Sequence, residues 1–227
     1  MAKPTLIAGL VSALIAVIQV EAADLSTKAI EKSAPPRELD ESIRKLLQER
    51  SVQIVDGTKE VYEFWFVREV PITAKPASSA KALETLKQTT LLGAVFVSKN
   101  ARDYRDDDLA AAIYTLRFSL QPQDGNHLGT AEFPYFAVLI PAKIDTKPDG
   151  IKDYKAMVKA SSKETSTDHP VIFSLFPKSV SDAPATRLNQ PAMEHKSFSV
   201  RIPAKLAGSE EKAEIAFELV VEGKGKK

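Results

Sequence analysis

IYTLRFSL, at residues 113–120, alternates apolar and polar side chains with a period of two. Successive side chains of a β-strand point to opposite faces, so this alternation predicts a strand with one face in the core. The apolar face is expected to carry Tyr114, Leu116, Phe118 and Leu120, and the opposite face Thr115, Arg117 and Ser119.

Seven further β-type segments surround this strand, and a turn of Asp56-Gly57, typical of a hairpin, separates the first two. Long helical patterns do not alternate with these segments, which argues against an α/β fold. The expected fold is all-β, an antiparallel β-sandwich or a partly open barrel, with one short N-terminal helix. The seven segments are 52–55, 60–70, 91–97, 135–140, 171–176, 196–202 and 214–221.

The N-terminal helix is predicted from an apolar stripe that recurs at helical spacing. The stripe consists of Leu39, Ile43, Leu46 and Leu47. Shorter helical turns are indicated at 81–86 and 151–158, inside the long connections 71–90 and 142–168. Connections of that length usually hold structure or carry function.

The N-terminus has the pattern of a secretory signal peptide, residues 1–22, with Lys3, an apolar run from Leu6 to Val20, and Ala22 before the cleavage point. The alternative is an uncleaved membrane anchor, but the run is shorter than the roughly 20 apolar residues that a span needs. The expected domain organisation places a flexible spacer at 23–37, a single β-sandwich domain at 38–223 and a disordered basic tail at 224–227.

Charge and composition exclude several classes of protein. The chain has 31 Lys+Arg against 30 Asp+Glu, so no electrostatic footprint for nucleic acid exists. With no Cys, disulfides, thiol nucleophiles and iron–sulfur clusters are excluded. The sequence lacks a nucleophile elbow, a P-loop, a dinucleotide-binding glycine pattern and a zinc-protease helix, and therefore names no catalytic residue.

A polar connection follows the strand at 113–120. The turn-forming residues of Asp124-Gly-Asn126 would present polar side chains at a constrained tip. One interpretation is a turn whose side chains satisfy its own backbone; the other is a ligand site on a rigid sheet. The candidate ligand-binding residues are Arg117, Gln121, Asp124, Asn126 and His127.

The three histidines, His127, His169 and His195, all lie near strand ends. Three imidazoles with Asp124 would suffice for a transition metal, if the fold brings the strand ends together. Their separations lack the local spacing of a specific metal motif, so exposed or hydrogen-bonded histidines are the alternative. Apart from this metal, no cofactor is expected.

Two other segments have both a structural and a functional interpretation. The carboxylate-rich run Asp103–Asp108 is either a solvated turn or a calcium loop, and Arg117 either pairs with one of its aspartates or clamps an anionic ligand. The aromatic residues of 62–66, including Trp65, are either core or a carbohydrate platform. Core is the more common place for aromatic residues on a strand.

The chain resembles a family of exported bacterial proteins, most specifically over residues 112–142. The resemblance implies export and one intact domain, and it does not imply any particular activity. In this chain Phe133-Pro-Tyr-Phe136 lacks the Asp that the family has before the Phe, so a role for that carboxylate does not carry over. The matching segments are Tyr114–Arg117, Gln121–Gly129, Phe136–Ala142 and His169-Pro170.

These observations predict a monomeric, non-catalytic β protein in the periplasm or outside the cell. Its expected partner is a small molecule or an envelope component, with no nucleic acid and no membrane span after cleavage. The alternative is a metal-binding protein or metal-dependent enzyme with a site from His127, His169 and His195.

Overall fold

The computed structural model describes residues 25–99, 101, 108–122, 131–164, 169–177, 188–189 and 196–222. Strands dominate it, so the predicted all-β class is confirmed. The elements are β1 (Leu25–Ile30), α1 (Glu41–Arg44), β2 (Ser51–Asp56), β3 (Lys59–Phe66), β4 (Val70–Ile72), the 3₁₀ helix η1 (Ser79–Thr85), β5 (Leu91–Val97), β6 (Ala112–Leu120), β7 (Tyr135–Pro141), α2 (Tyr154–Ser161), the 3₁₀ helix η2 (Ser162–Glu164), β8 (Ile172–Pro177), β9 (Leu188–Asn189), β10 (Lys196–Leu206) and β11 (Lys212–Glu222).

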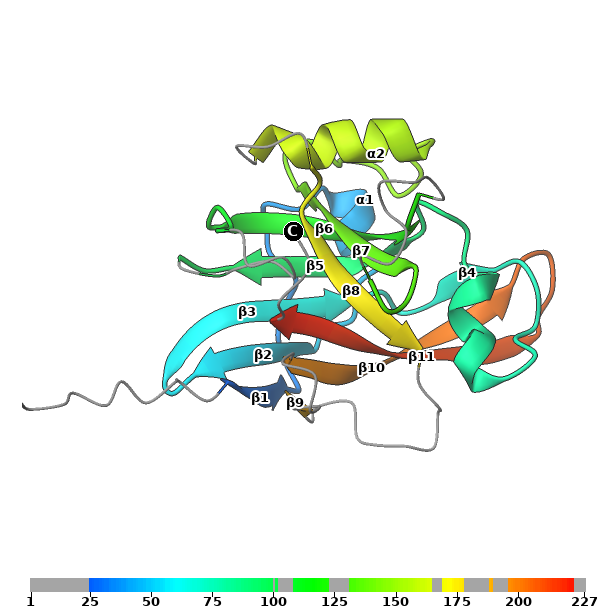
Figure 1. Cartoon of the computed structure of the whole chain (residues 1–227), viewed down its shortest axis with the longest axis horizontal. Helices are drawn as coiled ribbons and strands as arrows, with labels where there is room; N and C mark the ends of the chain where they lie inside the picture. The colour runs from blue at the N-terminus through cyan, green and yellow to red at the C-terminus, as the bar shows by residue number, and fades with distance from the viewer. Residues whose placement is uncertain are drawn as a thin grey trace, which may run out of the picture.

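All strands belong to one sheet, in the order β1-β2-β3-β5-β6-β7-β8-β11-β10-β4, with β9 paired to β10. Neighbours along it are antiparallel, except that β4 runs parallel to the end of β10. The sheet curls into a half-barrel (Figure 1). Of the two expected architectures, the structure is therefore the partly open barrel and not the two-sheet sandwich.

Aromatic side chains from three strands fill the inside of the half-barrel. The ring centroid of Phe64 on β3 lies 5.2 Å from that of Phe198 on β10 and 5.8 Å from that of Phe173 on β8. Tyr62 meets Phe173 edge to face, with 5.5 Å between the centroids. Each such pair contributes about 0.5–1.5 kcal/mol beyond the apolar area it buries. The cluster joins strands that lie far apart in the sheet order.

The predicted N-terminal helix is shorter than its apolar stripe. Asp40 caps α1 by accepting a hydrogen bond from the Ser42 amide at 2.9 Å, and the helix ends at Arg44. Beyond it, the backbone pairs with the end of β3: the Gln48 amide donates to the Phe66 carbonyl at 2.9 Å. This change of backbone direction explains why Leu46 is 42% exposed, a correction to its predicted place in the buried stripe. The other stripe residues, Leu39, Ile43 and Leu47, are buried.

Residues 25–30, predicted as part of a flexible spacer, form β1, which is a correction. They pair along the whole of β2, from Leu25 opposite Asp56 to Ile30 opposite Ser51. The sequence LSTKAI hides this strand because an edge strand buries little of either face. The chain after β1 then crosses the outer face of β3, where Trp65 Nε1 donates to the Ser33 carbonyl at 3.2 Å. The predicted signal peptide and tail lie outside the described residues.

Two glycines occupy positions at which a side chain has a cost, one through its backbone conformation and one through a close contact. Gly57 has φ +58° in the two-residue loop between β2 and β3, which confirms the predicted hairpin, since primed turns need positive φ at the first central position. Gly93 on β5 lies against β3, so closely that a Cβ there would sit 2.3 Å from the Trp65 carbonyl oxygen.

A second helix, α2, covers part of the outer face of the sheet (Figure 1), whereas only one short N-terminal helix was expected in the fold class. Its start is capped by Asp153, whose carboxylate accepts from the Ala156 amide at 2.9 Å. Met157 packs with Val138 and Ile140 of β7 in a small second core. The sequence segment 151–158 indicated this helix, which begins at Tyr154 and continues to Ser161. The helical turn predicted at 81–86 is confirmed as η1.

Candidate functional site

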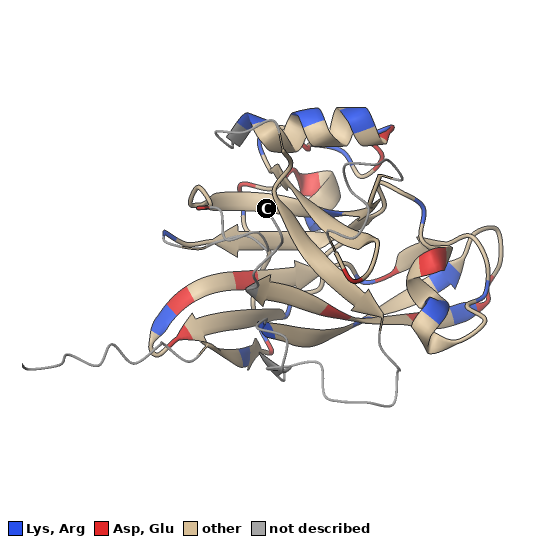
Figure 2. Ribbon diagram, viewed as in Figure 1, with Lys and Arg blue, Asp and Glu red and all other residues tan. Residues whose placement is uncertain are grey.

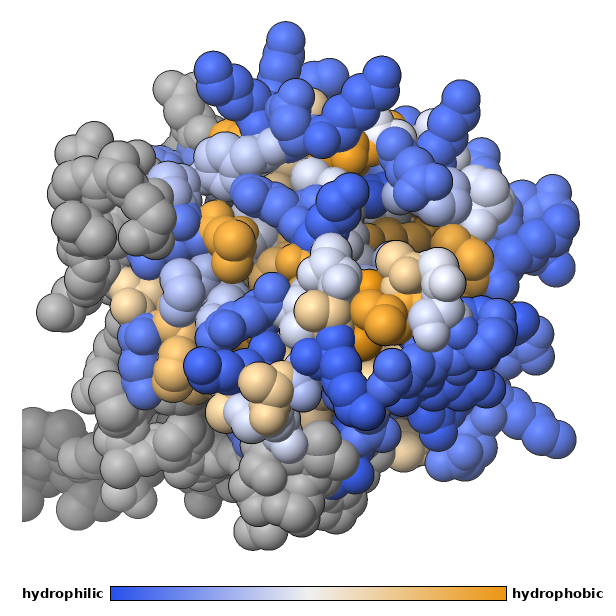
Figure 3. Space-filling view, turned by 90° about the vertical axis from the view of Figure 1, so that its right-hand side faces the viewer, coloured by the Kyte–Doolittle hydropathy of each residue, from blue (hydrophilic) through white to orange (hydrophobic). Residues whose placement is uncertain are grey.

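A groove of about 590 Å³ opens between η1, the end of β6, the start of β7 and the start of α2. We call it the lateral groove. Figure 3 shows the side of the molecule on which η1 lies, where apolar side chains gather in a band bordered by hydrophilic ones. The groove is lined by Leu83, Glu84, Leu86, Gln88, Leu120, Gln121, Pro122, Pro134, Tyr135 and Tyr154.

One wall of the lateral groove is built by the register of β6 and β7. Leu120 pairs with Tyr135, and the Gln121 amide donates to the Pro134 carbonyl at 2.8 Å. The polar connection that follows β6 therefore begins and ends side by side on this wall, at Gln121 and Pro134. Leu120 remains 40% exposed, an unusual exposure for a large apolar residue at the end of a buried strand.

The opposite wall contributes the one charged side chain among the described lining residues, Glu84 of η1. Burial, and then the negative charge of Glu84 beside the phenol, raise the pKa of Tyr135 above its usual value. The phenol therefore stays protonated throughout the neutral range. The Tyr135 ring also stacks on Phe118, with 6.2 Å between the centroids.

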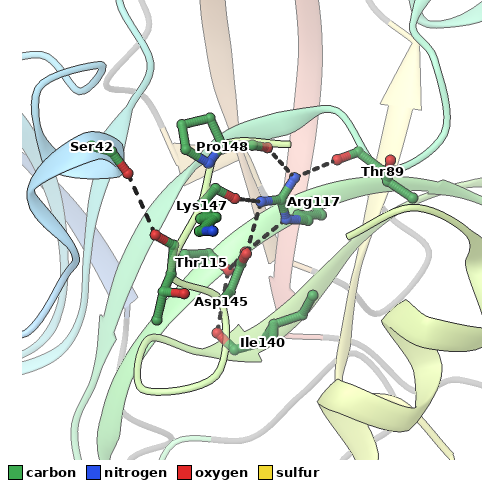
Figure 4. Close-up of polar contacts among 9 residues, drawn as sticks. Ser42, Thr89, Thr115, Arg117, Ile140, Asp145, Lys147 and Pro148 are labelled. Carbon is green, nitrogen blue, oxygen red and sulfur yellow. Dashed lines mark hydrogen bonds and ion pairs between the residues drawn. The ribbon is translucent and has the colours of Figure 1, made fainter. Parts of the chain in front are cut away.

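Beneath the groove, Arg117 of β6 forms a buried ion pair with Asp145 (Figure 4). Arg117 Nε lies 2.7 Å from Asp145 Oδ2, and Nη2 lies 2.8 Å from Oδ1, so both ends of the carboxylate are bound. The Thr115 hydroxyl, two residues earlier on the same strand, donates to Oδ2 at 2.5 Å. This two-point geometry is the strongest form of an arginine–carboxylate contact.

The other three N–H groups of Arg117 bind backbone carbonyls. Nη1 donates to Thr89 and Pro148, and Nη2 to Lys147, each at 2.8 Å. Thr89 has φ +75°, a left-handed conformation that a β-branched residue rarely adopts, and its carbonyl points at the guanidinium (Figure 4). The guanidinium thus holds the segment after η1 and the segment before α2 against the same strand.

These contacts lie beside the groove walls. Gln88 directly precedes Thr89, and Tyr154 follows the turn at Lys147–Pro148 by a few residues. Because the segment after Gln88 and the turn before α2 are both bonded to Arg117 on β6, three segments next to the lateral groove share one anchor.

The structure changes the interpretation of Arg117. It lies on the face opposite Leu116, as the alternation predicts, but its acidic partner is Asp145 and not an aspartate of the 103–108 run. All five of its N–H groups are used within the protein, so none is left to clamp an anionic ligand. Arg117 therefore has a structural role beside the groove, and the prediction that it binds a ligand is wrong.

Of the other sequence-predicted site residues, Gln121 lines the groove. Asp124, Asn126 and His127 lie outside the described residues, as do Asp103, Asp106 and Asp107 of the acidic run.

Of the three histidines predicted to bind a metal, only His169 is among the described residues, and His127 and His195 lie outside them. Among the residues that the structure describes, no group of three or more His, Asp or Glu side chains lies close enough together to hold a metal.

Sequence reasoning missed Glu84, Tyr135 and Tyr154 as site residues. Each lies in a segment whose secondary structure was predicted: a helical turn, a strand and a helix. Their convergence depends on which side of the sheet η1 and α2 cover, and no local sequence signal carries that information.

Comparison with protein-family models, curated proteins and solved structures finds no match. Within the described residues, no helix is both long enough and apolar enough to cross a membrane.

Proposed function

We propose that the chain is an exported, non-catalytic binding protein that holds a mainly apolar small molecule in the lateral groove. The observation that carries this proposal is the groove itself: about 590 Å³, with apolar walls and a few polar groups. Small-molecule sites typically occupy about 300–1,000 Å³ and combine an apolar lining with a few polar groups that fix orientation.

The shared anchor beside the groove supports a binding role. Affinity improves when the site does not have to be ordered by the ligand, because the conformational entropy has already been lost on folding. Arg117 supplies this order through its bonds to Thr89, Lys147 and Pro148, which lie in segments next to the groove. Leu120, on the wall formed by β6 and β7, offers an exposed apolar contact surface.

The composition of the groove supports binding over catalysis. Acid–base chemistry needs a donor and an acceptor with matched pKa values, and covalent chemistry needs an activated nucleophile. Its described titratable side chains are Glu84, Tyr135 and Tyr154. The Glu84–Tyr135 pair holds a proton on the phenol, since the pKa of Tyr135 is raised, and such a phenol is a poor base.

Export is proposed from the sequence of residues 1–22. A binding protein outside the cytoplasm meets its ligand directly, without a transport step. The absence of Cys is compatible with this location, because the half-barrel is stabilised by a large buried apolar core.

The proposal is tested with the neutral fluorescent probe N-phenyl-1-naphthylamine and the protein purified from expression of its full sequence. Saturable binding is expected, and Leu120→Glu should weaken it by at least about tenfold, because an apolar ligand that covers a carboxylate on this wall removes its hydration. Leu46→Glu is the matched control, since Leu46 is equally exposed (42% against 40%) and does not line the groove. Equal binding by the two variants, or no saturable binding by the parent protein, would overturn the proposal.

A further inference from the structure

We infer that the lateral groove selects ligands that carry an ammonium group on an apolar body. This inference rests on the proposed binding function and adds the chemical class of the ligand. It is built on three features of the described lining: its charge, its aromatic residues and its apolar residues.

The described lining carries only negative charge. Glu84 is its single charged residue, and the neutral polar groups are the two amides of Gln88 and Gln121 and the two tyrosines. The Glu84 side chain is exposed and lines the groove together with the phenol of Tyr135. A ligand cation is attracted to this carboxylate, and a ligand carboxylate is repelled by it.

Two aromatic rings strengthen the preference for a cation. Tyr135 lies at the start of β7 and Tyr154 at the start of α2, so their rings line the groove from different elements. The face of an aromatic ring attracts ammonium groups, and aromatic residues around a cation are a common way to recognise alkylated ammonium ions. A carboxylate ligand gains nothing from the same rings.

The rest of the groove provides the place for the apolar body. Leu83, Leu86 and Leu120 line it together with two prolines, and no described lining residue other than Glu84 carries a charge. An alkyl chain loses contact with water there, while its head group stays near Glu84 and the tyrosines.

The two lysines nearest to Glu84 in the sequence do not line the groove. Lys81 and Lys87 are exposed on and after η1 but are not among the residues that line the groove. Figure 2 shows that basic and acidic residues are interspersed along the ribbon, so no broad field of one sign covers this side. Lys87 therefore provides a matched control for a change of charge outside the groove.

The experiment compares octylammonium, 1-octanol and octanoate, which share one chain length and differ in head-group charge, by isothermal titration calorimetry. At low salt, octylammonium should bind on the order of fivefold more tightly than octanoate, with 1-octanol between them. Added salt should reduce this ratio, because Glu84 is exposed and its field is screened.

Glu84→Gln should remove most of the preference for octylammonium and leave the affinity for 1-octanol unchanged. Lys87→Gln, the control, should not reduce the preference. Binding of 1-octanol with equal affinities for octylammonium and octanoate, or tighter octanoate binding, would overturn the inference and leave the binding function standing. Binding of none of the three would overturn the proposed function itself.

Discussion

Arg117 and Asp145 form a two-point ion pair in the interior, with Nε–Oδ2 and Nη2–Oδ1 separations of 2.7 and 2.8 Å. Their side chains are 1% and 0% exposed. Burying two charges is expensive, and the cost is offset only when every hydrogen-bonding group finds a partner. Here the pair is completed by three backbone carbonyls and Thr115. The result is a cross-link between strand β6, the segment after η1 and the turn before α2.

Removing the cation should destabilise the protein strongly. Arg117→Met leaves the Asp145 carboxylate buried without its counter-charge, and such a change costs about 3–5 kcal/mol. Urea unfolding followed by Trp65 fluorescence measures the effect. A loss under about 1 kcal/mol would show that water reaches Asp145 and that the pair is not a buried cross-link.

Removing both charges should restore part of that loss. In Arg117→Met with Asp145→Leu, no buried charge remains, the Thr115 hydroxyl loses Asp145 as its acceptor, and the carbonyls of Thr89, Lys147 and Pro148 lose their donor. The double variant is therefore expected to be more stable than Arg117→Met alone. It should still bind N-phenyl-1-naphthylamine more weakly than the parent protein, because the segments next to the groove are no longer fastened. Parent-like probe binding would contradict the positioning role of Arg117.

The contact of β5 with β3 predicts different costs at two glycines. Gly93→Ala places a Cβ 2.3 Å from the Trp65 carbonyl oxygen, so the strands must move apart, at a cost of about 1–3 kcal/mol or more. Gly57→Ala meets no atom within 4 Å and costs only the positive φ, about 1 kcal/mol. Thermal unfolding of both variants checks the order, and a larger loss for Gly57→Ala would refute the close approach.

The Glu60–Glu63 pair on β3 predicts a pH-dependent stability. Burial, and then the charge of Glu63, raise the pKa of Glu60 above its ordinary 4.5. Ionised Glu60 therefore lowers the free energy of unfolding above its raised pKa, and the penalty disappears below 4.5, where both states are protonated. Glu60→Gln should stabilise the protein by up to about 1 kcal/mol near neutral pH and have no effect in acid.

The control for this prediction is Glu69→Gln, at an exposed position on the turn before β4. Urea midpoints of the parent and both variants are compared across the acidic range. A gain from Glu60→Gln that is the same at every pH would mean that ionisation of Glu60 is not its source.

The sequence was sufficient for most of the strands because each of these has a local signal. Alternation in 113–120 identified β6 and its two faces, and Asp56-Gly57 identified the first hairpin. The short or edge strands β1, β4 and β9 have no such signal, because they bury few side chains and depend on a partner strand. Each is held by its pairing with a longer strand, β2 for β1 and β10 for β4 and β9.

Arg117 shows why the candidate site was harder to predict than the fold. A charged residue opposite Leu116 suggests a solvent-facing side of the strand, and an arginine near a polar loop suggests a ligand clamp. That face is covered instead by the connection that carries Asp145 and by α2. Asp145 is only one carboxylate among many in the sequence, and its pairing with Arg117 is a property of the folded chain.

The central claim, that the lateral groove is the ligand site, is tested most directly by mapping ligand binding with nuclear magnetic resonance. In a titration with 1-octanol, the side-chain amides of Gln88 and Gln121, which line the groove, should show the largest shifts among the glutamines. Gln48, which lines a separate hollow of about 90 Å³ between β1 and β10, and Gln53 on β2 should remain unchanged. Saturable shifts at Gln88 and Gln121 alone are the predicted result; shifts at Gln48 with none at Gln88 and Gln121 would contradict the account.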